Sequence, residues 1–266
     1  MTSPVVLLKA LALLLALVFI PLSALLLLSA VTWTGFLLGT SVFLIAVGPL
    51  LHWIGDERDS LLQIRVAKAL LAFGLVLALF LFLQAPEGRT EASARMHVRF
   101  ADGSWRFDRF ALANVLPEID QIHLGFLAAR AFDPMMTARQ LDDLADMCGA
   151  FYAEMEQEPD FHACGSALPA IYKELTLAEF RDGHYFHYIP PTLDRAKPSP
   201  ALVFLHGSGG NFKVYAWLLS KVADQVGCSG IAPTVGFGNW ERRGACEATS
   251  AAMADGGKHA GIDPDH

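Results

Sequence analysis

The sequence has no charged residue from Ala10 to Gly55. A single straight helix over these 46 residues would measure about 69 Å, whereas the hydrocarbon core of a bilayer is about 30 Å thick. The length therefore excludes one span, and a soluble domain has no means of covering so many leucines. The sequence predicts an integral membrane protein whose charge-free stretch folds back inside the lipid bilayer.

Small and polar residues interrupt the leucines between Ser29 and Gly35, and Trp33 suits an interfacial position there. A polar loop is expected from Gly55 to Arg65. The apolar run is too long for a cleaved signal peptide, and a buried core helix remains an alternative for the third span alone. The predicted membrane region covers residues 1–84, with helices at Val5 to Val31, Phe36 to Ile54 and Val66 to Leu83.

The basic residues that flank the predicted spans divide unequally, with Lys9, Arg58, Arg65 and Lys68 on one side and Arg89, Arg95 and Arg99 on the other. The positive-inside rule then places the N-terminus in the cytoplasm. We therefore expect a plasma or inner membrane protein whose soluble domain faces outward, into the periplasm or the extracellular space.

The four cysteines lack a CxxC pair and any Cys/His ligand spacing, so no structural zinc site is indicated. Cys148 and Cys164 could form a disulfide if the soluble domain faces an oxidising compartment; two ordinary buried thiols are the alternative. His184 and His187 lie on opposite faces of a predicted strand, which disfavours a shared metal. With a net charge of −7 and no basic stripe, nucleic acid is not an expected partner. No cofactor is predicted.

Residues 85–174 are predicted to form a linker and a helical segment. Gln84 to His97 is polar and reads as the linker. Asn114 to Arg130 has a broad apolar face, with Pro117 in the first turn. Thr137 and Gln140 form a capping box ahead of a helix that continues towards Glu156. Ser166 to Lys173 is a shorter helical candidate.

The pattern changes to an α/β type over residues 175–240. Leu175 to Arg181 and His184 to Ile189 are predicted strands, joined by an Asp-Gly pair typical of a type I′ hairpin. Ala201 to Leu205 is continuously apolar, as in a strand buried on both faces. After a glycine loop, Asn211 can cap a helix that runs to about Val226. Ser229 to Thr234 is a further strand.

Three interpretations compete for the glycine loop from His206 to Gly210. A P-loop requires a lysine at a spacing that Lys213 does not have. A dinucleotide fingerprint fails at Phe212, where its last glycine is required. The third is an oxyanion loop, in which backbone N–H groups converge on the oxygen that becomes negative when an ester carbonyl is attacked. The order of apolar strand, HGxGG and helix suits this interpretation best.

This segment resembles the small esterase branch of the α/β-hydrolase superfamily. The resemblance rests on three features: the predicted hairpin, the stretch Pro200-Ala-Leu-Val-Phe-Leu-His-Gly-Ser-Gly-Gly-Asn211, and Ala232-Pro-Thr234. The resemblance covers about 60 of the 266 residues. It implies carboxylic-ester hydrolysis and a small ester substrate. It also implies an oxyanion loop composed of His206, Gly207, Ser208, Gly209 and Gly210. The amide of Ser208 or Gly209 would be the donor, and His206 would brace the loop without acting as the base.

The sequence contains no G-x-S-x-G nucleophile motif, and no acid and histidine follow one. The alanine- and glycine-rich residues 241–266 are expected to be an aberrant or disordered tail that forms no helix or strand. We therefore predict a three-span membrane region followed by an incomplete α/β domain. The hypothesis is a truncated or frameshifted hydrolase without catalytic residues, with an open, poorly covered sheet. The alternatives are a non-catalytic membrane-anchored scaffold and, less favoured because the spans carry few ionisable residues, a transporter.

Overall fold

The computed structural model describes residues 4–86, 94–101, 109–172, 183–194, 197–238, 240–241, 244–260 and 262–263. The chain divides into two compact units. The first, here called the membrane unit, comprises Met1–Gln84 and Ile119–Asp146. The second, the sheet unit, comprises Ala85–Glu118 and Met147–His266.

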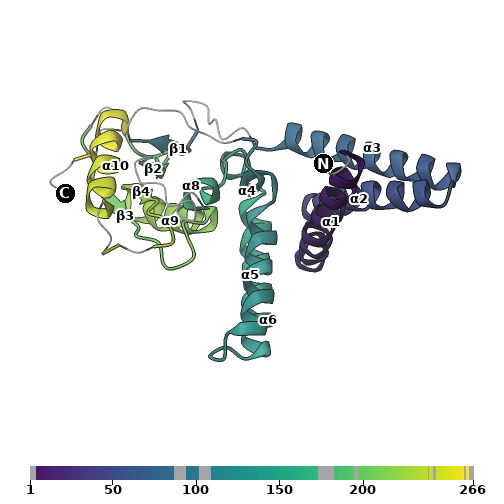
Figure 1. The fold of residues 1–266 in the computed structure, drawn as a ribbon. Coiled ribbons are helices and arrows are strands. Elements are labelled where there is room, and N and C mark those ends of the chain that lie inside the picture. The colour runs from purple at the N-terminus through teal and green to yellow at the C-terminus, as the bar shows by residue number, and fades with distance from the viewer. Residues whose placement is uncertain are drawn as a thin grey trace. The chain divides into compact units, whose positions relative to one another are not determined.

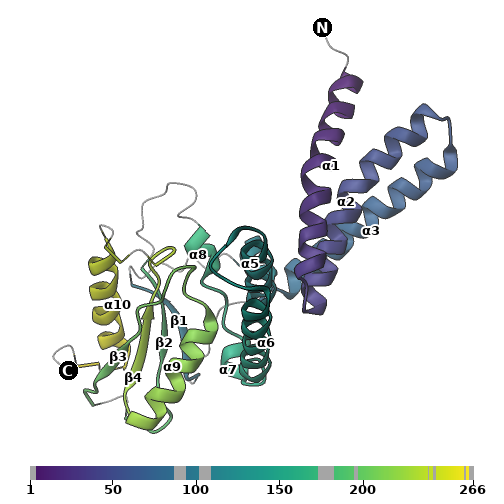
Figure 2. The same ribbon diagram turned by 90° about the horizontal axis from the view of Figure 1, so that it is seen from below.

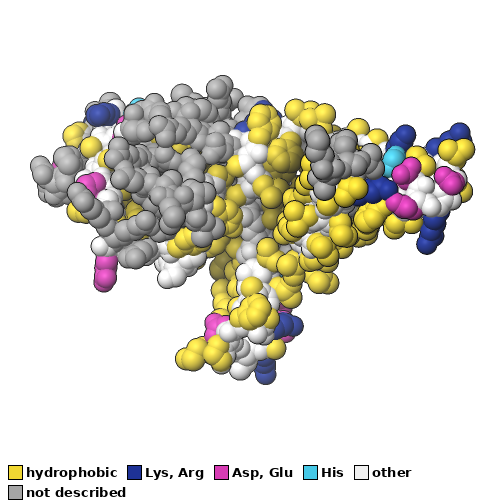
Figure 3. All heavy atoms as spheres, in the orientation of Figure 1, with side chains coloured by type: hydrophobic (Ala, Val, Ile, Leu, Met, Phe, Trp, Pro, Cys, Tyr) yellow, Lys and Arg dark blue, Asp and Glu magenta, His cyan; other side chains and the backbone are white. Residues whose placement is uncertain are grey.

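Three long apolar helices open the membrane unit: α1 (Pro4–Ser29), α2 (Trp33–Glu57) and α3 (Leu61–Gln84) (Figure 1). Each is long and apolar enough to cross a membrane, which fits an integral membrane protein and agrees with the three apolar helices expected. Many of their leucines and phenylalanines are exposed, and the acidic and basic side chains gather where α2 meets α3 (Figure 3).

The turns between these helices are shorter than the sequence suggested. Thr32 caps α2, because its side chain accepts a hydrogen bond from the N–H of Gly35 at 3.0 Å. The predicted loop from Gly55 to Arg65 is wrong, since α2 continues to Glu57 and α3 begins at Leu61. Asp59 makes the tight connection possible by adopting a φ of 51°, a left-handed conformation that aspartate tolerates better than most residues.

Small residues allow α2 and α3 to approach closely. A Cβ added at Gly48 would lie 2.9 Å from the Cβ of Leu71, and one added at Gly74 would lie 3.0 Å from the Cβ of Leu44. Ser41 Oγ also donates a hydrogen bond to the Gly74 carbonyl at 2.9 Å. In lipid, close backbone packing and interhelical hydrogen bonds associate helices, because burying leucine there gives no hydrophobic free energy.

Helices α5 (Glu118–Phe132) and α6 (Ala138–Met155) form a hairpin, of which residues 119–146 belong to the membrane unit. The predicted capping box is confirmed, because the Gln140 N–H donates to Thr137 Oγ1 and the Thr137 N–H donates to Gln140 Oε1. Near the start of α5, the buried Asp120 accepts the N–H groups of Val31 and Thr32 at 2.7 and 3.0 Å. The first part of α5 thereby fixes the turn between α1 and α2.

A mixed sheet forms the centre of the sheet unit. Its strands are β1 (Met96–Phe100), β2 (His184–Tyr188), β3 (Ala201–Val203) and β4 (Ser229–Pro233), in the order β1-β2-β4-β3. The β1–β2 and β2–β4 pairs are antiparallel, and the β3–β4 pair is parallel. The strand β1 corrects the expectation of a linker as far as His97. The predicted strand at Leu175 to Arg181 lies outside the described residues.

Helices cover both faces of this sheet (Figure 2). Gly230 of β4 lies against Leu219 of α9 (Lys213–Val226), and the next residue, Ile231, lies against Gly256 of α10 (Ala245–Ala260). Because neighbouring strand residues point to opposite faces, α9 and α10 cover opposite sides. Three short helices complete the unit: α4 (Leu112–Val115), α7 (Pro159–His162) and α8 (Leu168–Tyr172).

The expectation that residues 241–266 form neither helix nor strand is wrong. Ala252 of α10 and Ile262 are buried in a core cluster with Tyr185, Ile189 and Ile231. Ile262 also forms a parallel bridge with Ser199. Alanine and glycine make this possible, because they let α10 approach the sheet closely without large aliphatic side chains of its own. The strand β3 is likewise less buried than predicted, with Val203 38% exposed.

Candidate functional site

The glycine loop from His206 to Gly210 connects β3 to α9. Gly209 and Gly210 have φ values of 102° and 127°, which side chains other than glycine rarely allow. A Cβ at Gly210 would also lie 2.5 Å from Ile171 Cδ1 in α8, whereas nothing lies within 4 Å of a Cβ added at Gly207. Glycine is therefore required at the end of the loop but not at its beginning.

A second glycine turn, from Val235 to Gly238, packs on this loop. A Cβ at Gly238 would lie 2.4 Å from the carbonyl oxygen of Gly207. The Gly209 N–H donates a hydrogen bond to the Phe237 carbonyl at 3.1 Å, so this amide is already engaged. Ser208 is exposed. Of the two donors implied by the resemblance, the Ser208 amide is thus the one left available within the described part of the chain.

His206 is buried, and both of its ring nitrogens are engaged. Nε2 accepts the Val235 N–H at 3.1 Å, which leaves Nδ1 to donate to the Gly207 carbonyl at 3.0 Å. Trp240 Nε1 donates to the His206 carbonyl at 2.7 Å. Burial lowers the pKa of His206, which favours the neutral ring. His206 lies where it can brace the loop, and it has no free nitrogen with which to act as a base.

Asn211 does not cap α9 as expected. The cap position is Phe212, with no side-chain hydrogen bond. Asn211 is instead fully buried, and its Nδ2 donates to the Ala232 carbonyl and to Thr234 Oγ1, both at 2.9 Å. Thr234 Oγ1 also contacts His184 Nδ1 at 2.8 Å. This buried network holds the glycine loop against the carboxyl end of β4.

Behind the loop, the buried carboxylate of Glu118 fixes the start of α9. It accepts the Lys213 N–H at 2.8 Å, the Tyr152 hydroxyl at 2.8 Å and the Ser166 hydroxyl at 2.5 Å. A carboxylate is favoured at a helix N-terminus by the helix dipole. Asn114 Oδ1 accepts the Ser166 N–H at 3.1 Å. The Glu118 cluster (Glu118, Tyr152, Ser166 and the Lys213 amide) joins four segments that are distant in sequence.

Burial raises the pKa of Glu118, against the opposing effects of Lys213, Ser166 and Tyr152. The ammonium group of Lys213 forms an ion pair with Glu156 at 3.2 Å. Sequence reasoning missed this cluster, although the placement of Glu118 after Pro117 was a signal. A glutamate at that position usually stabilises the start of its own helix, whereas here Glu118 accepts a backbone N–H at the start of α9.

All four cysteines are free thiols in the structure, so it does not contain the Cys148–Cys164 bond that the disulfide alternative requires. Burial raises the pKa of Cys164 to about 12, which makes this thiol unreactive at neutral pH. Within the described ranges, no group of three or more His, Cys, Asp or Glu side chains is placed to hold a metal ion.

Comparison with known proteins found no matching family model, no matching curated protein and no matching solved structure.

Proposed function

We propose that this protein is a membrane-anchored serine-hydrolase-type protein whose glycine loop binds the anionic oxygen of a carboxylic-ester intermediate. One observation carries the proposal: the HGxGG loop connects the third strand to the helix that follows it, with the Ser208 amide available. In α/β-hydrolases, an N–H from the loop in this position supplies half of the oxyanion hole. The small ester remains the proposed ligand class.

The same 266 residues contain no G-x-S-x-G nucleophile, and both ring nitrogens of His206 are engaged. We therefore propose binding without turnover for this chain. A fluorophosphonate probe, which labels activated serines, is expected to leave the purified full chain unmodified. Labelling of any serine would contradict the absence of a catalytic serine.

Binding at the loop can be tested with an alkyl phosphonate monoester, whose anionic oxygens resemble the tetrahedral intermediate. We expect titration calorimetry of the full chain in detergent to detect binding. Gly210→Ala should abolish it, because alanine is strained at a φ of 127° and meets Ile171. Gly149→Ala in α6 is the matched control, since its Cβ enters open space outside the loop. Equal binding by both variants would contradict a role for the loop.

A non-catalytic scaffold is the second candidate function. It is favoured by the hydrogen bond from Gly209 to Phe237, which leaves the loop with one available amide of the two that the resemblance offers. If the wild-type chain binds no phosphonate while its circular dichroism remains native, this second function is the better one.

We further propose that the sheet unit faces outward, on the basis of the distribution of basic residues around the spans. Cys246 is the exposed cysteine of this unit. A membrane-impermeant maleimide is expected to label it in intact cells from which any outer envelope has been removed. Labelling of Cys246 only after permeabilisation would place the sheet unit in the cytoplasm.

A further inference from the structure

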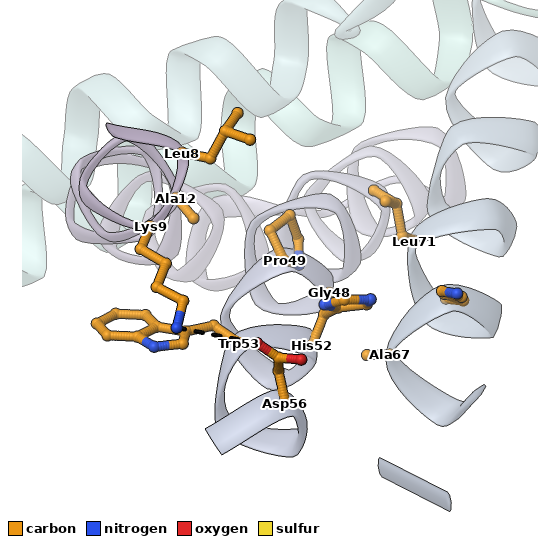
Figure 4. Close-up of a pocket in the computed structure, with 11 residues that line it drawn as sticks. Leu8, Lys9, Ala12, Gly48, Pro49, His52, Trp53, Asp56, Ala67 and Leu71 are labelled. Atoms are coloured by element: carbon orange, nitrogen blue, oxygen red, sulfur yellow. Dashed lines mark ion pairs between the residues drawn. The ribbon is translucent and has the colours of Figure 1, made fainter. Parts of the chain in front are cut away.

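The membrane unit contains a pocket of about 390 Å³ among α1, α2 and α3. It lies at the end of the three helices that carries Lys9 and the α2–α3 turn (Figure 4). In Figure 2, α1 diverges from the α2–α3 pair towards its N-terminal end. Glycine and alanine hold α2 and α3 together at this level, since a Cβ at Gly48 would lie 3.2 Å from the Ala67 carbonyl.

A charged side chain reaches across this opening. Lys9 of α1 forms ion pairs with Asp56, at 3.8 Å, and with Glu57. Its ammonium group also lies 5.9 Å from the centre of the Trp53 ring. Lys9 is therefore already engaged by the two carboxylates and is not itself available to a ligand.

The pocket is lined mainly by apolar surface, with a few polar side chains near the α2–α3 turn. His52, Asp56 and Lys68 line it on that side, Gly48 and Leu71 line it about one turn further along the same two helices, and Leu8 and Ala12 line it from α1. Along α2, the pocket extends from Gly48 to Asp56. These two residues are eight positions apart, which corresponds to about 12 Å of helix. Neither Lys68 nor His52 has a hydrogen-bond or ion-pair partner within the described part of the chain, so both are available to a ligand.

We propose that this pocket binds one glycerophospholipid, with its phosphate at Lys68 and His52 and an acyl chain along Leu8, Ala12 and Leu71. The surrounding bilayer supplies such a molecule at high concentration. An ammonium group and an imidazole suit a phosphate, and the apolar part accommodates the first carbons of the chain. This site is independent of the ester-binding loop.

The test is native mass spectrometry of the full chain in detergent with added dioleoylphosphatidylglycerol. We expect one retained lipid per chain in the wild type. Lys68→Gln should weaken retention about tenfold, and Arg65→Gln should leave it unchanged. Arg65 is the matched control, because it is one turn away on α3, is also exposed and does not line the pocket.

Two further ligands separate the parts of the proposal. Dioleoylglycerol lacks the phosphate and glycerol 3-phosphate lacks the chains, so both should be retained far less than the phospholipid. Ala12→Phe fills the apolar part and should also remove the lipid, with helix content by circular dichroism as the folding control. Equal retention by all variants, equal loss in Lys68→Gln and Arg65→Gln, or no lipid on the wild type would overturn the proposal.

Discussion

The membrane unit and the sheet unit distribute their side chains in opposite ways. The membrane helices expose large apolar residues, such as Leu28 at 74%, and bury small ones, such as Ala67 and Ser41. The sheet unit buries its large residues, among them Tyr185 and Phe186. In water, burying apolar area drives folding; in lipid it does not, and close backbone contact takes its place. The same chain therefore follows two packing rules.

The α2–α3 contact and the sheet unit also differ in how they use polar groups. Between α2 and α3, one hydroxyl–carbonyl hydrogen bond accompanies the glycine contacts. In the sheet unit, the Glu118 cluster and the Asn211 network connect whole segments through buried polar atoms. Removing a buried carboxylate should thus matter most where it joins distant segments, as Glu118 does in the sheet unit and Asp120 does at the α1–α2 turn. Adding volume should matter most between α2 and α3.

The largest effect is expected from Glu118→Ala. It removes the acceptor of three donors, from Tyr152, Ser166 and Lys213, and each buried donor left without a partner costs about 1–3 kcal/mol. We expect a loss of at least about 3 kcal/mol in the unfolding free energy of the sheet unit. Urea titration of the full chain in nanodiscs, followed by tryptophan fluorescence, would measure it.

The matched control is Glu154→Ala, an exposed glutamate of α6 for which no loss is expected. Similar midpoints for the two variants would show that the Glu118 cluster does not stabilise the unit.

A smaller loss is expected from Gly48→Val in the membrane unit. The new side chain would collide with Leu71 and push α2 and α3 apart, and overpacking of this kind costs about 2 kcal/mol. Thermal unfolding in detergent, followed by circular dichroism, would report it. Leu75→Val, at an exposed position of α3, should leave the midpoint unchanged. If Gly48→Val and Leu75→Val had the same unfolding midpoint, close contact between α2 and α3 would not stabilise the membrane unit.

The smallest effect is a dependence on pH. Burial raises the pKa of Glu118, so the folded state binds a proton more tightly than the unfolded state does. Stability should therefore fall as the pH rises from the ordinary glutamate pKa through the raised folded value, by at most about 1.4 kcal/mol per pH unit. Urea midpoints between pH 4 and pH 8 would show this slope. Glu118→Gln should flatten this slope. If the slope were unchanged in Glu118→Gln, a titratable group other than Glu118 would cause it.

Local patterns were sufficient to predict some elements. Uninterrupted apolar length predicted three spans, and Thr137 with Gln140 predicted the start of α6, because both signals lie within a few residues. The strand β1 was missed because it is five residues long and its partner β2 begins about 80 residues later. The helix α10 was missed because alanine and glycine show no apolar periodicity, although they suit close packing on Ile231.

The candidate site was predictable only in part. The position of the glycine loop followed from its motif, since an apolar strand precedes it and a helix follows. The roles of Glu118 and Asn211 did not, because they depend on contacts with residues between 21 and 95 positions away. A sequence pattern shows which residue types are present, whereas long-range contacts decide which of their hydrogen-bonding groups remain available.

The two turns of the membrane helices have a consequence for insertion. The α1–α2 turn carries no charge, whereas the sequence around the α2–α3 turn contains Asp56, Glu57, Arg58 and Asp59. A hairpin of α1 and α2 can enter the bilayer by carrying only Ala30 to Thr32 through the hydrocarbon. The short turn at Asp59 then brings α3 in beside α2, while the four charges stay on the side from which insertion began.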